Sequence, residues 1–377
     1  GHAHALVLKA WGMDPLPGAR LTVINPGPTA PYTGMLPGYV AGHYRRNELE
    51  IDLVRLCRHA GARLIFDKAV DINQVRHEVT LETRGPVAYD LASIDVGITA
   101  RLDLPGFSEY GIGAKPLNLY AKRWKNFLEQ VLQGQAAADI AVIGGGVAGC
   151  ELAMAMAFAL QSAGESPRVT VIESGPKISV VGDKARRRIL KAMSDLGIVV
   201  KTEAKIVEVT ADQVLLDGQE PVAAVLCVGA AGGSAHKWIS QTNLPQRDGF
   251  IKIGADLGVL GDEALFAVGD CASMTTGLLP KAGVFAVRAA PILHHNIRMA
   301  LSGGRRKPWR PQKDYLKLIS LGGQSAVAEK FGFTLAGASM WRWKDRVDKA
   351  FMNQLSDLPK MEVLIETGKL ATVYGLR

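Results

Sequence analysis

The stretch ADIAVIGGGVAGC, residues 138–150, decides the fold of this chain. An apolar run of strand-forming residues breaks into Gly144-x-Gly146-x-x-Gly149, and a helical stretch rich in alanine and methionine follows. Gly144 permits a tight turn, Gly146 lets the backbone approach a pyrophosphate at the helix N-terminus, and Gly149 lets helix and strand pack closely. The pattern therefore predicts a dinucleotide-binding unit.

An acidic residue follows at the position that this kind of site requires. Glu173 closes the strand-like segment RVTVIES (168–174), 24 residues after Gly149. A carboxylate there accepts hydrogen bonds from ribose hydroxyls and repels a 2′-phosphate. Arg168 and Lys177 are cationic neighbours, but the acid favours NAD(H) over NADP(H).

Length and composition indicate a large folded enzyme of two or three domains. The chain has 377 residues, of which 48% are apolar, and this length exceeds what one hydrophobic core usually supports. The net charge of +8 suits an anionic membrane surface or an acidic partner. No dense basic run is interleaved with aromatic residues, so we predict no nucleic-acid partner.

Two further compositional features bear on location and redox chemistry. Residues 140–160 are apolar enough to suggest a membrane span, but Glu151 and the glycines argue against one. The N-terminus lacks a secretory pattern, so we expect a cytoplasmic protein, or one peripheral to the inner membrane. The cysteines are Cys57, Cys150, Cys227 and Cys271. Their spacing predicts packing residues and neither a disulfide framework nor a metal site.

Strand-like and helix-like segments alternate along the chain, which predicts an α/β fold with parallel sheets. Residues 19–25, 138–144 and 168–174 read as buried strands, and residues 47–61 and 184–197 read as amphipathic helices. Segments 61–97 and 197–229 share one layout, in which a strand and a hairpin precede an apolar strand that closes on a glycine. The chain is therefore predicted to contain two copies of one nucleotide-binding unit.

The first copy begins at the N-terminus in an unusual way. Gly1 and His2 read as the back half of a glycine turn, with His4 in the third glycine position. The expected first strand and first glycine of this copy are missing ahead of Gly1. Asn25 takes the place of the ribose-binding acid, while ordinary turn and helix-start roles for the two histidines remain the alternative.

The segment LFAVGDCA (265–272), followed by Pro280-Lys281-Ala282-Gly283-Val284, resembles the flavin-binding motif of the pyridine nucleotide-disulfide oxidoreductase superfamily. The resemblance implies that Gly269 and Asp270 bind FAD, with the carboxylate holding the ribityl chain. The helix that opens at Ala282 and Gly283 would then point its dipole at the flavin pyrimidine. Lys281 is the predicted catalytic cation that stabilises the reduced flavin, and an exposed helix-start lysine is the alternative.

Other motifs follow in the order typical of that superfamily. Segments 93–107 and 226–232 are similar to its interdomain motifs, which places Gly97 and Gly229 at the cofactors. In GMLPGYVAG, the resemblance implies flavin contacts for Gly34, Leu36 and Pro37. Position 34 is where coenzyme A-disulfide reductases and NADH oxidases carry a redox cysteine, so thiol chemistry is excluded there.

Neither the paired cysteines of disulfide reductases nor those of sulfide:quinone oxidoreductases are found in the sequence. Cys57 and Cys271 remain candidates for a thiol near the flavin. Type II NADH:quinone oxidoreductases carry a glutamine motif where this chain has Val284 and Arg288. Quinone reduction is therefore an alternative that this motif does not support.

Within the superfamily, segments 31–44, 114–124, 280–297 and 341–352 resemble the NADH dehydrogenase-like subgroup found beside or fused to selenide, water dikinase. This resemblance implies an FAD-dependent NADH oxidoreductase with an unidentified electron acceptor, linked to selenium metabolism and to that kinase as a partner. Two alternatives stay open. One is a peripheral membrane enzyme like type II NADH:quinone oxidoreductase, and the other is a non-catalytic redox-sensing protein that binds FAD and NAD.

The expected architecture has three parts. An FAD-binding domain comprises residues 1–122 and 250–310, an NAD(H)-binding domain comprises 123–249, and a C-terminal α+β domain comprises 311–377. In the last part, Trp343, Val347, Ala350 and Phe351 are expected to share one helical face. That face could meet a membrane surface, the flavin domain or a second subunit in a homodimer.

Overall fold

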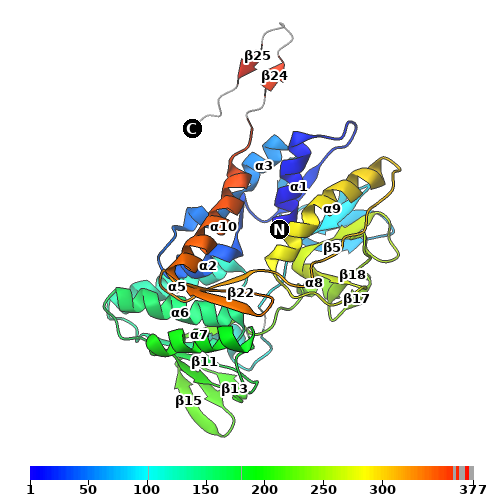
Figure 1. Ribbon diagram of the computed structural model, residues 1–377. Helices are drawn as coiled ribbons and strands as arrows, with labels where there is room; N and C mark the ends of the chain where they lie inside the picture. The colour runs from blue at the N-terminus through cyan, green and yellow to red at the C-terminus, as the bar shows by residue number, and fades with distance from the viewer. Residues whose placement is uncertain (101, 180, 360–361, 365–369, 373–377) are drawn as a thin grey trace.

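The computed structural model describes residues 1–100, 102–179, 181–359, 362–364 and 370–372. Two α/β units lie side by side with a smaller C-terminal unit against them (Figure 1). The predicted α/β class, with two Rossmann-like units and a C-terminal α+β part, is confirmed.

The first α/β unit is built around a parallel sheet with the strand order β12-β11-β10-β16-β9. Its strands are β9 (Gly111–Gly113), β10 (Asp139–Ile143), β11 (Arg168–Ile172), β12 (Val199–Lys201) and β16 (Leu226–Gly229). Its helices are α5 (Leu117–Leu132), α6 (Val147–Ser162) and α7 (Asp183–Asp195). Every residue of β10 is buried, because helices cover both faces of a sheet of this kind. An antiparallel sheet of β13 (Ile206–Val209), β14 (Gln213–Leu216) and β15 (Gln219–Ala223) lies at one end.

The second α/β unit draws on two distant parts of the sequence. Helix α1 (His2–Met13) packs against α9 (Gly283–Leu301), and residues from 3–60 and 239–297 share one hydrophobic core. Two parallel pairs join β1 (Thr22–Asn25) with β4 (Arg63–Phe66) and β8 (Ala92–Ile94) with β19 (Leu265–Ala267). Small sheets contain β5 (Ala69–Asn73), β6 (Glu78–Leu81) and β7 (Val87–Ala88), and β17 (Gln246–Arg247), β18 (Phe250–Ile253) and β20 (Ala272–Met274).

The repeated layout predicted for 61–97 and 197–229 is confirmed. In both copies a parallel strand leads into a three-stranded antiparallel sheet and then into another strand with a parallel partner. The shorter elements are η1 (Thr33–Met35), α2 (Leu36–Val40), α4 (Phe107–Tyr110), α8 (Lys237–Ser240) and η3 (Gly269–Cys271).

The prediction of one continuous helix over 47–61 is wrong. A 3-10 helix η2 (Arg46–Leu49) leads into strand β3 (Glu50–Asp52), which pairs with β2 (Thr29–Pro31), and α3 begins only at Leu53 and ends at His59. The Asp52 side chain accepts a hydrogen bond from the backbone N–H of Arg55 at 2.9 Å. This N-cap starts a new helix where an amphipathic pattern alone predicted continuation.

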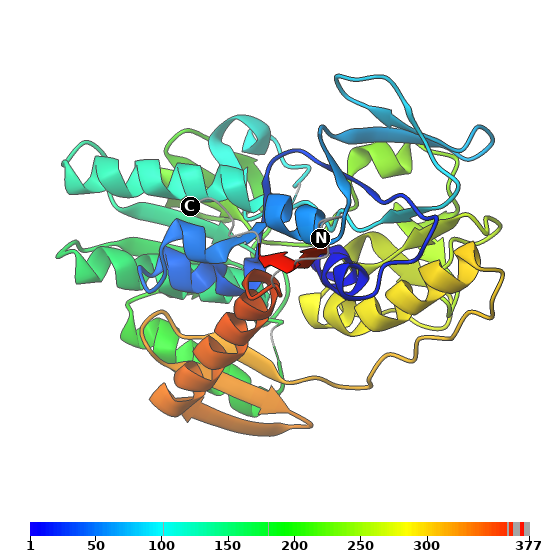
Figure 2. The ribbon, with the colours of Figure 1, turned by 90° about the horizontal axis from the view of Figure 1, so that it is seen from above.

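The C-terminal unit has three antiparallel strands, β21 (Lys317–Ser320), β22 (Ala326–Lys330) and β23 (Phe333–Gly337), followed by α10 (Ala338–Ser356). Viewed from above, α10 lies beside both the N-terminal region and the unit that contains α6 (Figure 2). Strands β24 (Glu362–Leu364) and β25 (Leu370–Thr372) form a further antiparallel pair.

The expected apolar face of α10 is also corrected. Phe351 is buried, whereas Trp343, Val347 and Ala350 are exposed, so the predicted apolar face is not buried as a unit. The buried face instead includes Lys344 and Asp348, which the sequence placed toward solvent. No helix within the described residues is long and apolar enough to cross a membrane.

Candidate functional site

The glycine turn between β10 and α6 has the geometry that a dinucleotide site requires. Gly144 has φ +110°, and a Cβ there would lie 2.6 Å from the backbone nitrogen of Ala231. A Cβ on Gly149 would lie 1.9 Å from the Gly144 carbonyl oxygen. Gly146 is the N-cap of α6, and nothing lies within 4 Å of the Cβ that it lacks. The turn therefore leaves room for a phosphate at the N-terminus of a 16-residue helix.

Glu173 lies directly beside this turn, at the end of β11. Its carboxylate accepts one hydrogen bond from the N–H of Gly145 and one from the N–H of Gly175, each at 2.8 Å. A carboxylate has about four acceptor positions on its two oxygens. The group is thus held against the glycine turn and keeps acceptor capacity for ribose hydroxyls.

The N-termini of α1 and α9 converge in the other α/β unit. Gly1 is the N-cap of α1, and a Cβ on Gly283, the first residue of α9, would lie 3.4 Å from Nδ1 of His2. Asp270, in the turn after β19, has a largely buried carboxylate that lies in the same unit. Two helix N-termini suit the pyrophosphate and the electron-rich pyrimidine of FAD, and the carboxylate suits the ribityl hydroxyls. The residues present therefore fit FAD.

The remaining predicted flavin contacts fall into two groups. Gly34, Leu36 and Pro37 lie together where η1 leads into α2, and Ala282 is the N-cap of α9. Asn25 instead donates its side-chain N–H groups to the carbonyls of Gly27 and Thr29, at 2.7 and 3.3 Å. The Asn25 amide thus stabilises the loop after β1. Its predicted contact with a ribose stays a prediction.

Two glycines close the strands that lead toward the cofactors. Gly97 has φ +69°, which favours glycine, in the segment after β8. Gly229 ends β16, where a Cβ would lie 2.5 Å from the ring of Phe107. Both positions require glycine for local geometry, and their predicted cofactor contacts stay predictions.

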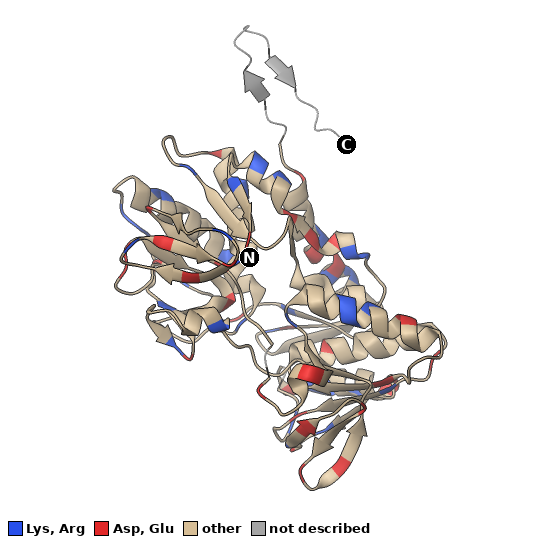
Figure 3. Cartoon of the chain, turned by 180° about the vertical axis from the view of Figure 1, so that it is seen from behind, with Lys and Arg blue, Asp and Glu red and all other residues tan. Residues whose placement is uncertain are grey.

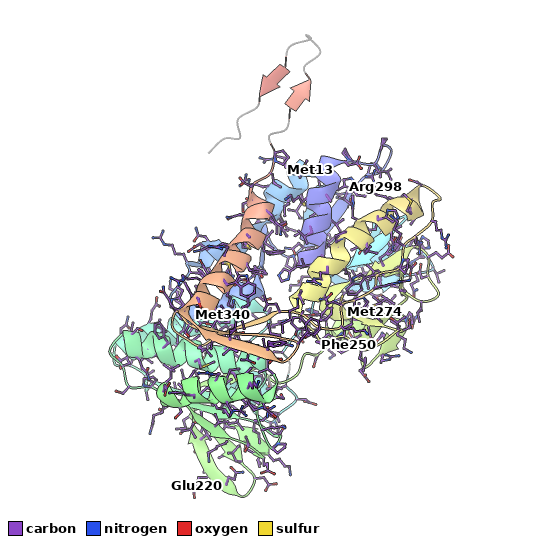
Figure 4. The ribbon with its side chains drawn as sticks, in the orientation of Figure 1. Met13, Glu220, Phe250, Met274, Arg298 and Met340 are labelled. Atoms are coloured by element: carbon purple, nitrogen blue, oxygen red, sulfur yellow. The ribbon has the colours of Figure 1, made fainter. Side chains whose placement is uncertain are left out.

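Lys281 points toward the small β17-β18-β20 sheet. Its Nζ donates to the Ala272 carbonyl at 2.8 Å and lies 3.8 Å from the centroid of the Phe250 ring. Burial lowers the pKa of Lys281, although Asp270 acts to raise it. This ammonium lines a small cleft of about 110 Å³ that also includes Asp270 and Met274. Phe250 and Met274 are labelled in Figure 4. A catalytic role for Lys281 stays a prediction.

Sequence reasoning missed two charged residues on the flavin side. Lys115, in the segment that enters the dinucleotide unit, places Nζ 3.5 Å from Oδ2 of Asp270. Asp95, buried after β8, accepts a hydrogen bond from the backbone N–H of His4 at 3.0 Å. Lys115 belongs to the segment 114–124 singled out above, and that signal could have identified it.

Sequence reasoning also missed a buried polar cluster between α10, α6 and η1. Lys344 Nζ donates to Asp348 Oδ2 at 2.7 Å and to the Gly34 carbonyl at 2.8 Å, while Tyr32 Oη donates to Asp348 Oδ1 at 3.0 Å. We call Tyr32, Lys344 and Asp348 the tyrosine cluster. Residues of both charge signs alternate along α10 (Figure 3), which is why the pattern did not show the buried pair.

Glu151 of α6 lies next to this cluster. Its Oε1 accepts a hydrogen bond from the backbone N–H of Ser320 at 2.7 Å. Burial raises the pKa of Glu151 to about 7, while the charge of Lys344 and this hydrogen bond act in the opposite direction. The carboxyl group is therefore balanced between its neutral and charged forms near neutral pH.

All four cysteines are buried and form no disulfide. Burial raises the pKa of Cys57 to about 11 and the pKa values of Cys150, Cys227 and Cys271 to about 12. Because the thiolate is the reactive form, these thiols are poor nucleophiles at neutral pH.

Comparisons with known proteins agree with this geometry. Residues 1–290 match the family model described as pyridine nucleotide-disulphide oxidoreductase. The chain is 32% identical over 261 residues to demethylphylloquinone reductase NdbB of Synechocystis sp., a match that covers 67% of this chain and 63% of the relative. The matched region thus spans less than two thirds of that relative's length.

Solved structures share the fold. NDH2 of Plasmodium falciparum in complex with NADH superposes with a TM-score of 0.78 at 14% identity, over 94% of this chain and 97% of that one. The sulfide:quinone oxidoreductase of Aquifex aeolicus gives a TM-score of 0.77 at 16% identity, over 93% and 89% of the two chains. The protein belongs to the pyridine nucleotide-disulphide oxidoreductase family, whose two-nucleotide fold provides its sites for FAD and NAD(H).

Proposed function

We propose that this protein is an FAD-dependent NADH dehydrogenase that passes its electrons directly to a quinone. The observation that carries the NADH assignment is Glu173, whose carboxylate is held against the glycine turn by two backbone N–H groups. The names of the Synechocystis, Plasmodium and Aquifex proteins, which include quinone reductases and an NADH complex, support the quinone as acceptor.

In this proposal the chain's own residues position the reactants. The N-terminus of α6 binds the NADH pyrophosphate and Glu173 binds the adenosine ribose. Asp270 binds the ribityl hydroxyls of FAD, and the N-termini of α1 and α9 receive its pyrophosphate and pyrimidine. Bound FAD supplies the chemistry that accepts a hydride from NADH and releases two electrons to the acceptor.

Direct transfer follows from the state of the thiols. The described cysteines are buried, and burial raises the pKa of Cys271, the residue next to Asp270, to about 12. A thiol relay needs an accessible thiolate. We therefore assign no cysteine to the transfer of electrons from flavin to quinone.

Steady-state turnover of NADH tests the proposal. The FAD-loaded protein is expected to oxidise NADH with menadione, a soluble quinone, and with ferricyanide, a one-electron dye. Turnover with ferricyanide but not with menadione would reject a quinone as the acceptor. The selenium-linked acceptor and partner implied by the sequence would then be tested next. Turnover with neither would identify a non-catalytic nucleotide-binding protein.

We further propose that the surface formed by β23 and α10 meets a membrane. Phe331, Phe333 and Leu335 are strongly exposed on and beside β23, which packs on α10, where Trp343 and Val347 are also exposed. The cationic side chains of Arg342 and Arg346 are exposed on α10, and that of Lys330 is exposed at the end of β22, which pairs with β23. Aromatic side chains with cations around them suit an anionic bilayer surface, where quinones dissolve.

Cosedimentation with lipid vesicles tests this surface. The protein is expected to bind vesicles that contain anionic lipid more strongly than neutral ones, and replacement of Phe333 and Leu335 by serine should weaken that binding. Val75→Ser is the matched control, because Val75 is 94% exposed on the distant β5–β6 turn. Equal binding by the wild type and the double variant would reject the surface.

We also keep the domain division as a proposal. Residues 1–122 and 250–310 would form the FAD domain, 123–249 the NAD(H) domain and 311–377 the C-terminal domain. The core shared by residues from 3–60 and 239–297 supports the split FAD domain. Strand β9 lies within residues 1–122 but pairs with β16 in the sheet of the dinucleotide unit.

A further inference from the structure

The ring of Tyr32 fills the space beside Gly34. A Cβ on Gly34 would come within 2.6 Å of both Cζ and Oη of Tyr32. Any side chain at position 34 would therefore displace the Tyr32 ring. The polar group beside Gly34 is the Tyr32 hydroxyl.

The surroundings of Tyr32 place it at the flavin side of the molecule. Its ring meets the His2 ring edge-on at 5.2 Å and stacks on Phe351 at 4.6 Å. His2 opens α1 and lies against Gly283, the first residue of α9. The phenol is thus adjacent to the two converging helix N-termini that fit FAD.

A buried ion pair holds the phenol in place. Asp348 accepts from Tyr32 Oη at 3.0 Å and from Lys344 Nζ at 2.7 Å, and Lys344 also donates to the Gly34 carbonyl. The Asp348 and Lys344 side chains are only 7% and 11% exposed. Burying such a pair is costly unless its hydrogen bonds are satisfied. The pair therefore holds the Tyr32 hydroxyl in one position.

The phenol of Tyr32 holds its proton tightly. Burial, followed by the charge and hydrogen bond of Asp348, raises the pKa of Tyr32 above its ordinary value. Tyr32 therefore carries its proton at neutral pH. The charged and titratable groups around it are His2 from α1, Tyr44 after α2, and Lys344 and Asp348 from α10.

We propose that Tyr32 is a catalytic residue whose O–H turns from Asp348 to a quinone carbonyl and stabilises the negative charge that develops there, with Lys344 and Asp348 as its positioning residues. This inference rests on the proposed quinone reductase function. Reduction of a quinone to a hydroquinone takes two electrons and two protons. NADH supplies a hydride by way of FAD, and the remaining proton comes from solvent.

Tyr32→Phe is the direct test, because it keeps the ring on Phe351 and removes the hydroxyl. Tyr44→Phe is the matched control, since Tyr44 Oη donates to Asp345 of the same helix at 2.8 Å and packs against Gly38, away from Gly34. Three quantities are measured on the FAD-loaded proteins: the rate of flavin reduction by NADH, the rate of reoxidation by menadione or ferricyanide, and the calorimetric dissociation constant of menadione without NADH.

The expected result is selective. In Tyr32→Phe, menadione should bind about tenfold more weakly, because one hydrogen bond is lost. Reoxidation by menadione should slow at least as much, while NADH reduction and ferricyanide reoxidation stay unchanged. Asp348→Asn should slow the menadione step with a smaller effect on binding, and Tyr44→Phe should behave as wild type.

Three results would overturn the inference. Unchanged menadione binding and reoxidation in Tyr32→Phe would reject it while the proposed function stands. If Tyr32→Phe slowed flavin reduction by NADH and reoxidation by ferricyanide as much as reoxidation by menadione, the hydroxyl would be a structural group. Absence of menadione reoxidation in the wild type, with ferricyanide active, would reject the proposed function and the inference together.

Discussion

Replacing Glu151 by glutamine should stabilise the folded protein at about pH 8 and change its stability little at about pH 5. Burial raises the pKa of this carboxyl from its ordinary value of 4.5 to about 7. Below the ordinary value both folded and unfolded chains hold the proton. Between the two values the unfolded chain loses its proton first, so the free energy of unfolding falls as pH rises.

The size of the effect follows from that gap. Each pH unit between the two pKa values corresponds to about 1.4 kcal/mol, so the destabilisation above pH 7 reaches about 3 kcal/mol. Glutamine keeps the volume and an oxygen that can accept the N–H of Ser320. It carries no charge to desolvate, so the Glu151→Gln variant should gain about this amount at the higher pH.

Urea unfolding of the FAD-loaded protein, followed by tryptophan fluorescence, measures this difference. The free energy of unfolding of the wild type and of Glu151→Gln is measured at both pH values. The result that counts is how much the difference between the two proteins changes from the lower pH to the higher. Glu129→Gln is the control, because Glu129 on α5 is exposed and pairs with Lys125. A gain that is equal at both pH values, or a loss at the higher pH, would refute the reasoning.

Three other changes test the cofactor sites and the thiols. Asp270→Ala should weaken FAD binding about tenfold, because ribityl hydrogen bonds are worth about 1 kcal/mol each; full yellow absorbance after dialysis would reject the assignment. Glu173→Ala should reduce the preference for NADH over NADPH in stopped-flow reduction of the flavin, and an unchanged preference would make Glu173 structural. A variant with both Cys57 and Cys271 replaced by serine should keep most NADH oxidation with a dye and with the natural acceptor, because buried thiols act in packing. Loss of natural-acceptor turnover alone would reveal a thiol relay.

The glycine turn could be predicted from the sequence because its requirements are local. Gly144 needs a positive φ in the turn, and Gly149 packs against the Gly144 carbonyl of the same strand-turn-helix segment. Such local constraints leave a short motif in the sequence. Glu173 was predictable for the same reason, since one parallel crossover brings β11 beside β10. The repeated layout of the two units likewise depends on patterns within single segments.

The tyrosine cluster could not be predicted in this way. Tyr32 and Asp348 are 316 positions apart, and the burial of Lys344 depends on a hydrogen bond to Gly34. Helical periodicity assigns a charged residue to the solvent face unless a distant partner compensates for its burial. The interrupted helix at 50–52 has a related cause, because strand pairing with β2 outweighs an amphipathic pattern.

Anaerobic double-mixing spectroscopy tests the central claim most directly. The FAD-loaded protein is mixed first with one equivalent of NADH and then with menadione, and the flavin absorbance is followed throughout. We predict that NADH bleaches the flavin and that one menadione per flavin restores its absorbance. A flavin that NADH does not bleach, or that ferricyanide restores and menadione does not, would contradict the account.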